Sequence, residues 1–166
     1  MFDDSHLARR VAKPKSDFEG ALDVTIFREL TWSDFDRAVA WLAQHLKDIP
    51  AVGIYGEPRG GLPLAVTLSH RLALPYLVQM RPGAIWVDDI VDTGRTRDAV
   101  IDASICVAWF TRQTREDVLA AEVCTGGEWL VFPWCPLETA EAERSSYLAR
   151  RSRSSLSGDA GDRDLS

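Results

Sequence analysis

Long apolar runs, paired cysteines and an excess of basic residues are all missing from this sequence of 166 residues. The three cysteines, Cys106, Cys124 and Cys135, form no C-x-x-C pair, which argues against a metal site or a disulfide framework. No stretch approaches the roughly 18 apolar residues of a membrane span, and residues 1–12 are too charged for a signal peptide. We therefore expect a cytoplasmic protein with no membrane partner.

The charge balance excludes a surface that coats nucleic acid. The formal net charge is -6, and affinity for a polyanion requires clustered lysine and arginine. Charged residues make up 27% and hydrophobic residues 46% of the chain, a composition typical of globular proteins. The length fits one domain with a moderate core.

The densest chemistry lies in residues 84–96, AIWVDDIVDTGRT. The apolar residues 84–87 predict a strand buried on both faces of a parallel sheet. Two carboxylates, Asp88 and Asp89, follow directly, and Asp92 opens a turn before a helix-compatible segment. Ligands of open α/β sheets bind beyond the carboxyl ends of such strands, so we expect a binding site here.

The turn after Asp92, residues 93–96, is called the threonine turn below. Gly94 allows close approach of the backbone to a ligand, and the amides of a turn that enters a helix can cradle an anion. The nearby carboxylates can hold a sugar diol or a divalent cation, so a ribose 5-phosphate fits both parts. In the alternative interpretation the acids merely end a strand and cap a helix, because aspartate is a common helix cap.

A second glycine-bearing turn, residues 57–61, is called the arginine turn below. It lies between a predicted buried strand, residues 51–56, and a predicted helix that includes Leu64 to Leu72. Two glycines after an arginine expose amides around a cation, which suits a second phosphate or a diphosphate. Glycines also open helices for geometric reasons alone.

The remaining pattern predicts an α/β fold with a mainly parallel sheet of about five strands flanked by helices. Arg112 follows a predicted strand and is either a solvated charge or a ligand contact. Trp129 and Leu130 lie in an aromatic segment that forms either a hydrophobic cover or a stacking platform for a flat heterocycle. The other predicted elements are strands 22–27, 76–79, 105–110 and 118–123 and helices 33–47, 96–103 and 138–151.

The run VDDIVDTGRT resembles the phosphoribosyl-diphosphate-binding signature of the type I phosphoribosyltransferases. The arginine turn with Leu62 is similar to the S-R-G-G-L version in bacterial xanthine-guanine enzymes. The order of Trp129, an aliphatic residue and then P-W resembles the C-terminal hood of those enzymes. The resemblance covers roughly residues 22–134. It also implies a cis peptide between Pro58 and Arg59.

This resemblance implies transfer of a 5-phosphoribosyl group from phosphoribosyl diphosphate to a purine of the guanine, xanthine or hypoxanthine type. The resemblance further implies that diphosphate is released, that Mg²⁺ is the cofactor and that the enzyme acts in nucleotide salvage. We also expect a homo-oligomer. The composition of the two ends, which lie outside the resemblance, predicts a mobile arm at 1–20 and a disordered tail at 152–166. The domain would then span residues 21–151, with a hood at about 118–137.

The resemblance also implies roles for individual residues. The catalytic residues would be Asp88, Asp89 and Asp92, with Asp89 on the metal side and Asp92 as general base. Phosphate would bind Thr93, Gly94, Arg95 and Thr96, and diphosphate would bind Pro58, Arg59, Gly60 and Gly61. The base would contact Arg112, Trp129 and Leu130.

Two departures from the family pattern leave alternatives open. Only residues 76–87 lie between the preceding helix and Asp88, which leaves little room for the flexible loop that closes the site in the family. The chain could therefore be a non-catalytic sensor of phosphoribosyl diphosphate or of a nucleotide. Arg112 stands where the 6-oxopurine enzymes have lysine, so a pyrimidine or a modified purine is a further option.

Overall fold

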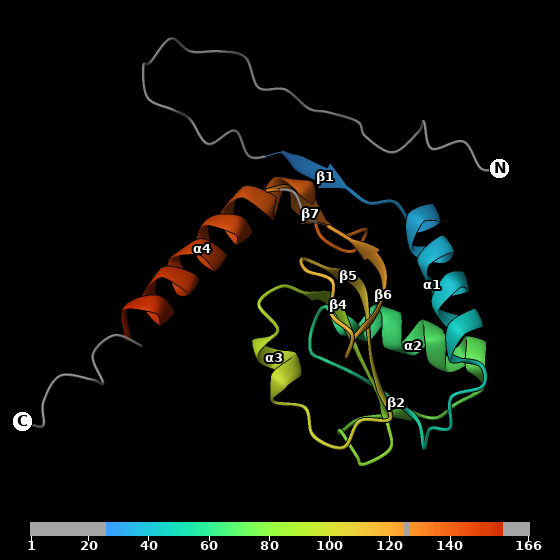
Figure 1. Ribbon diagram of the computed structural model, residues 1–166. Coiled ribbons are helices and arrows are strands. Elements are labelled where there is room, and N and C mark those ends of the chain that lie inside the picture. Colours follow the sequence, from blue (N-terminus) through green and yellow to red (C-terminus); the bar gives the residue numbers. More distant parts are fainter. Residues whose placement is uncertain (1–25, 125–126, 158–166) are drawn as a thin grey trace, which may run out of the picture. The chain divides into compact units, whose positions relative to one another are not determined.

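The computed structural model describes residues 26–124 and 127–157 (Figure 1). The described residues form two compact units, one within Trp32–Gly126 and one within Met1–Thr31 and Gly127–Ser166. Each unit is described by itself. The predicted N-terminal arm lies outside the described residues.

The larger unit contains a five-stranded sheet in the order β3-β2-β4-β5-β6, and every pair of neighbouring strands is parallel. This confirms the predicted α/β fold class. The central strand β5 is a nearly continuous apolar run, and β4 is apolar on either side of Asp88 and Asp89, as expected for strands that are covered on both faces. The strands are β2 (Ile54–Gly56), β3 (Tyr76–Leu77), β4 (Ile85–Val91), β5 (Ile105–Thr111) and β6 (Leu119–Val123).

Two helices, α1 (Trp32–Leu46) and α2 (Gly61–Leu72), pack against each other and along one face of this sheet (Figure 1). Apolar residues of α1 recur at helical spacing and are buried, which is the pattern of an amphipathic helix. Phe35 of α1 meets Trp109 of β5 with ring centroids 5.5 Å apart. The core of the unit therefore lies between these helices and the sheet.

The other face of the sheet has a lighter cover. A smaller buried cluster lies there, with Trp86, Cys106 and Ala108 as members. The helix that follows β4, α3 (Arg95–Asp98), has four residues, whereas the sequence predicted a helix over residues 96–103. The segment from Ala99 to Ser104 leaves the helix and returns to β5 as an irregular connection.

Strand β4 is longer than predicted, and this changes the setting of the acids. Its ladder with β5 continues to the pair Val91 and Thr111, so Asp88 and Asp89 lie within the strand instead of after it. Asp92 is the first residue beyond it. The connection from β3 to β4 comprises residues 78–84 and is as short as the sequence indicated.

The smaller unit pairs strand β1 (Phe27–Glu29) with β7 (Trp129–Val131) in parallel. Of the predicted strand 22–27, residues 22–25 lie outside the described residues. A 3-10 turn, η1 (Leu137–Thr139), leads into helix α4 (Ala140–Ser157), which runs beyond the predicted end at residue 151. The predicted tail from residue 158 onward is outside the described part. Among the described residues, no helix has the length and hydrophobicity needed to cross a membrane.

Substitution of Leu68 by alanine tests the packing of α2 on the sheet. Leu68 has no exposed surface, so the cavity left by the substitution should lower the free energy of unfolding by about 2–5 kcal/mol. The matched control is Val78→Ala, because Val78 is 83% exposed. Urea unfolding followed by circular dichroism measures both variants, and an equal effect of the two would contradict this packing.

Candidate functional site

The two turns singled out from the sequence lie at the carboxyl ends of the parallel strands of the larger sheet. This end of the sheet is called its edge below. Gly56 at the end of β2 pairs with Val87 of β4, and the Glu57 amide donates to the Val87 carbonyl at 2.8 Å. Because β2, β4 and β5 are parallel, the segments that follow them emerge at the same edge. The arginine turn, the acids of β4 and the threonine turn are therefore neighbours.

The arginine turn packs directly against β4, and only glycine fits at two of its positions. A Cβ atom at Gly60 would lie 2.1 Å from an Asp89 carboxylate oxygen, and one at Gly61 would lie 2.4 Å from the Val87 carbonyl oxygen. The Pro58–Arg59 peptide is cis, as the resemblance implied. The Arg59 side chain is exposed and pairs with no described residue.

The Gly61 amide has a partner within the arginine turn. It donates to the Glu57 carbonyl at 2.9 Å, at the start of α2. In this conformation the amide is engaged, so Gly61 serves close packing against β4. Arg59 and the Gly60 backbone remain as the parts of the turn that can meet an anion.

The acidic pair, Asp88 and Asp89, is partly buried and internally hydrogen-bonded. The Asp89 amide donates to the Asp88 carboxylate at 2.9 Å, and the Ile90 amide donates to the Asp89 carboxylate at 2.8 Å. Burial, and then the charge of Asp89, raise the pKa of Asp88 to about 9. Burial also raises the pKa of Asp89. Two carboxyl groups this close favour a shared proton or a cation.

A third carboxylate, Glu57, belongs to the same edge and was not predicted as a site residue. It accepts a hydrogen bond from the Trp86 indole at 3.0 Å, and its charge contributes to the raised pKa of Asp88. The described residues contain no cluster of three or more histidine, cysteine or acidic side chains that would hold a metal ion by itself. A cation here would need oxygen atoms from a ligand as well.

The threonine turn has the backbone of an anion cradle. Gly94 has φ +80°, a left-handed conformation that favours glycine. The Thr93 hydroxyl accepts the Arg95 amide at 3.4 Å, and the Asp98 amide donates to the Gly94 carbonyl at 2.7 Å. Within the described residues nothing accepts a hydrogen bond from the Gly94 or Thr96 amide. These two donors remain available to a ligand.

Asp92 and Arg112, to both of which the resemblance gives a role at the base, lie close together. The Arg112 guanidinium is 3.9 Å from the Asp92 carboxylate and donates to the Cys124 sulfur at 3.2 Å. The Arg112 amide donates to the Val91 carbonyl at 3.0 Å. The pairing of β4 with β5 therefore brings an acid and a cation to one position.

The predicted base platform belongs to the smaller unit. Trp129 is partly buried, and its ring lies 5.6 Å from that of Tyr147 in α4. Leu130 is buried. Trp129 and Leu130 thus belong to one unit, and the acidic strand with its two turns belongs to the other.

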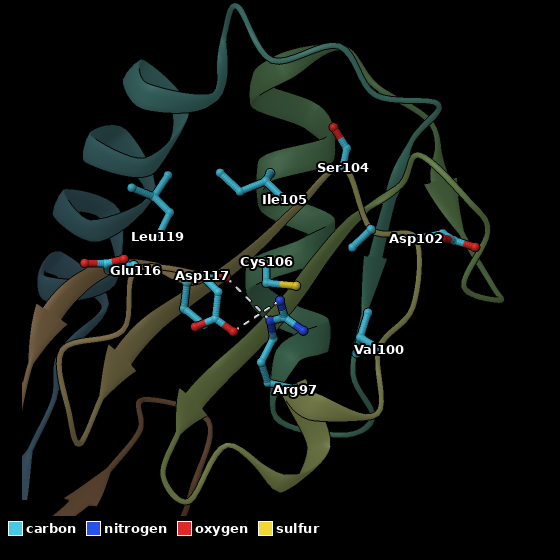
Figure 2. A pocket seen from close by; sticks show the side chains of 11 residues that line it. Arg97, Val100, Asp102, Ser104, Ile105, Cys106, Glu116, Asp117 and Leu119 are labelled. Carbon is cyan, nitrogen blue, oxygen red and sulfur yellow. Dashed lines mark hydrogen bonds and ion pairs between the residues drawn. The ribbon is translucent and has the colours of Figure 1, made fainter.

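A cavity of about 470 Å³ lies away from this edge, beside the first residues of β5 (Figure 2). Ile105 and Cys106 line it, and its wall includes an ion pair in which Arg97 lies 3.2 Å from Asp117. The pattern of the sequence gave no sign of this cavity, because its walls come from segments that are separate in the chain.

The fold and this edge together define an α/β protein in which two acids, open backbone amides and an exposed arginine meet at the carboxyl ends of parallel strands. Comparison with solved structures makes the class more specific. The chain is similar to a purine phosphoribosyltransferase from Pyrococcus horikoshii, with 28% identity and a TM-score of 0.54 over 66% of this chain and 94% of that one. It is also similar to the Helicobacter pylori xanthine-guanine-hypoxanthine phosphoribosyltransferase, at 16% identity and TM-score 0.53 over 70% and 97% of the two chains.

A hypothetical protein from Neisseria gonorrhoeae with bound ppGpp is similar as well, at 16% identity and TM-score 0.51 over 69% of this chain and 92% of that one. No protein-family model and no curated protein matches the chain. The chain has the fold of the type I phosphoribosyltransferases, and the predicted resemblance is confirmed at the level of the fold.

The acidic pair should make the stability of the ligand-free protein depend on pH. The folded state holds the Asp88 proton up to about pH 9, whereas the ordinary pKa is 3.8. The folded state then binds more protons, so stability should fall as pH rises from about 4 to about 9. Asp88→Asn, which cannot ionise, should flatten this slope and raise the melting temperature at about pH 8.

Calorimetry across this pH range, with EDTA in the buffer, measures the effect. Asp48→Asn is the matched control, because Asp48 is an exposed acid in the turn that follows α1. Parallel profiles for Asp88→Asn and the wild type would show that the acidic pair does not hold a proton in the folded state.

Proposed function

We propose that this protein is a phosphoribosyltransferase that joins a purine base to the phosphoribosyl group of phosphoribosyl diphosphate and releases diphosphate. The observation that carries the proposal is the convergence of the acidic pair and both turns at one sheet edge, in a chain similar to a purine phosphoribosyltransferase at 28% identity. We further propose a cytoplasmic, homo-oligomeric enzyme of nucleotide salvage. The salvage role follows from the sequence resemblance, whereas the cytoplasmic location follows from the cysteine pattern and the short apolar runs of the sequence.

In this proposal the threonine turn binds the 5-phosphate. The available amides of Gly94 and Thr96 would donate to the phosphate oxygens, with the hydroxyls of Thr93 and Thr96 and the Arg95 backbone around them. Asp88 and Asp89 would accept hydrogen bonds from the 2- and 3-hydroxyls of the ribose. Contacts at both ends of the sugar would fix its orientation, which converts an encounter into an oriented reaction.

The arginine turn would hold the departing diphosphate. Arg59 is an exposed cation with no described partner, and Pro58, Gly60 and Gly61 shape the turn around it. Charge that develops on the leaving group is stabilised best by donors that are already in place.

The acidic pair also fits Mg²⁺ bound together with substrate. Mg²⁺ prefers carboxylate and phosphate oxygens and keeps several waters, and a cation beside the pair would offset the burial and the repulsion that raise the pKa of Asp88. Asp89, which borders the arginine turn, is the proposed contact on the metal side. When bound, the ion would screen the negative charge of the diphosphate.

Base recognition is assigned to Asp92, Arg112, Trp129 and Leu130. Asp92 would accept the proton of the purine nitrogen as a general base, and the adjacent Arg112 would polarise the base. Trp129 would stack on the heterocycle, with Leu130 beside it.

The direct test is an assay with Mg²⁺ and phosphoribosyl diphosphate in which guanine, hypoxanthine, xanthine, adenine, orotate and uracil are offered separately. Release of diphosphate that depends on the base would establish the transferase and name its substrate. Release with orotate or uracil alone would contradict the purine assignment.

A second candidate function is a non-catalytic sensor of phosphoribosyl diphosphate or of a nucleotide. The short connection of residues 78–84 favours it, because the larger unit has no long loop there to close over the reacting sugar. The structural similarity to the Neisseria protein with bound ppGpp makes ppGpp a suitable additional ligand for the test. Binding of phosphoribosyl diphosphate without turnover of any base would favour the sensor.

Replacement of Asp92 by asparagine should lower turnover on the order of 100-fold or more, because a general base contributes about that much. Affinity for phosphoribosyl diphosphate, measured by calorimetry, should change little. Asp36→Asn, which alters an exposed acid of α1, is the control and should retain full activity. Turnover equal to wild type would remove Asp92 from the chemistry.

Replacement of Trp129 by alanine should weaken purine binding by about 1–3 kcal/mol, the contribution of one base–aromatic stack. The affinity for phosphoribosyl diphosphate should stay constant, and Trp129→Phe should recover most of the loss. Trp134→Ala is the matched control, because Trp134 follows in the same segment and stacks on Phe132 at 5.1 Å. Unchanged purine affinity in Trp129→Ala would overturn the platform assignment.

A further inference from the structure

Arg115 is an arginine that neither the sequence motifs nor the proposed function has used. It lies in the connection between β5 and β6, which emerges at the same sheet edge as the threonine turn because β4 and β5 are parallel. A Cβ atom built on Gly94 would lie 1.8 Å from Arg115 Nη1. The guanidinium therefore lies directly against the backbone of the threonine turn, in space that only a glycine leaves open.

Two carboxylates hold the guanidinium in this position. Arg115 Nε donates to Asp117 Oδ1 at 2.9 Å, and Nη2 donates to Asp117 Oδ2 at 3.0 Å, so this pair is bidentate. Nη2 also donates to Asp98 Oδ1 at 2.7 Å, and Asp98 belongs to α3. Three hydrogen bonds thus fix the plane of the guanidinium, which is 25% exposed.

The nitrogen that lies against Gly94 is the one left unused. An arginine Nη1 carries two N–H groups, and within the described residues no hydrogen bond leaves Nη1 of Arg115. The amides of Gly94 and Thr96 beside it also have no described acceptor. Side-chain and main-chain donors thus gather at one place, and each lacks an acceptor.

We propose that Arg115 is a further phosphate-binding residue, whose Nη1 donates to an oxygen of the sugar phosphate held by the threonine turn. This inference rests on the proposed function and adds a residue to its 5-phosphate site. Because Asp98 and Asp117 hold the fork before the ligand arrives, little side-chain freedom is lost on binding. Hydrogen bonds between arginine and a phosphate are of the strong, charge-assisted kind.

Arg97 provides a matched control within the same cluster. It pairs with Asp117 at 3.2 Å and lines the cavity beside β5 (Figure 2), but the contact with Gly94 comes from Arg115. Arg97→Gln removes one positive charge and one ion pair from Asp117, as Arg115→Gln does, and Arg115→Gln in addition removes the pair with Asp98. A difference between the two variants therefore does not come from the loss of one positive charge.

The test is calorimetric titration of the full chain with ribose 5-phosphate and, separately, with diphosphate in the presence of Mg²⁺. Arg115→Gln should weaken ribose 5-phosphate binding about 10- to 100-fold, as expected for loss of a hydrogen bond to a charged group. Diphosphate binding should stay within about twofold. Arg115→Lys should recover part of the loss, because lysine keeps a donor but not the fork, and Arg97→Gln should bind both ligands as the wild type does.

Two results would overturn the role of Arg115 alone. One is wild-type affinity for ribose 5-phosphate in Arg115→Gln, and the other is an equal loss in Arg115→Gln and Arg97→Gln. Failure of the wild-type protein to bind ribose 5-phosphate would be a different result, because it would overturn the proposed 5-phosphate site together with this residue. Thermal unfolding of each variant checks that it is folded, and Arg115→Lys supplies the comparison if Arg115→Gln is not.

Discussion

The close packing of the arginine turn against β4 is the constraint on which the rest of the site depends. Gly60 leaves room for the Asp89 carboxylate, and Gly61 leaves room for the Val87 carbonyl. The Glu57 amide then bonds to Val87 and aligns the turn with the strand. A side chain at Gly61 would push the turn away from the strand, and one at Gly60 would displace the Asp89 carboxylate. The contact between the two segments places the turn that carries Arg59 beside two acids, at the edge where parallel sheets bind ligands.

The electrostatics of this edge suit an occupied site better than an empty one. Burial and the mutual charge of the acidic pair raise the pKa of Asp88 to about 9, so ionisation of both acids opposes folding while no cation or sugar is bound. The available amides and arginine nitrogens nearby present the opposite partial charge. Functional sites commonly hold such unfavourable arrangements, which the ligand relieves.

The local parts of the site were predictable from the sequence, and the contacts between distant parts were not. The apolar run before Asp88 and the glycines of both turns are read from neighbouring residues, so β4, both turns and the parallel sheet could be predicted. The extension of β4 to Val91 depends on its ladder with β5. Glu57 lies at this edge and contacts Trp86, and Arg115 contacts Gly94. Neither contact could be predicted from the spacing of residues in the sequence. The Pro58–Arg59 cis peptide followed from the family resemblance and not from any property of the residues.

The most direct test of the central claim is to map where phosphoribosyl diphosphate binds. In the amide nitrogen–proton NMR spectrum of the full chain, titration with this ligand and Mg²⁺ should move the signals of Gly60, Gly94 and Thr96. The signals of Ile105 and Cys106, which line the separate cavity, should stay in place. Shifts confined to the cavity residues, or no shifts at millimolar ligand, would contradict a phosphoribosyl site at the end of β4.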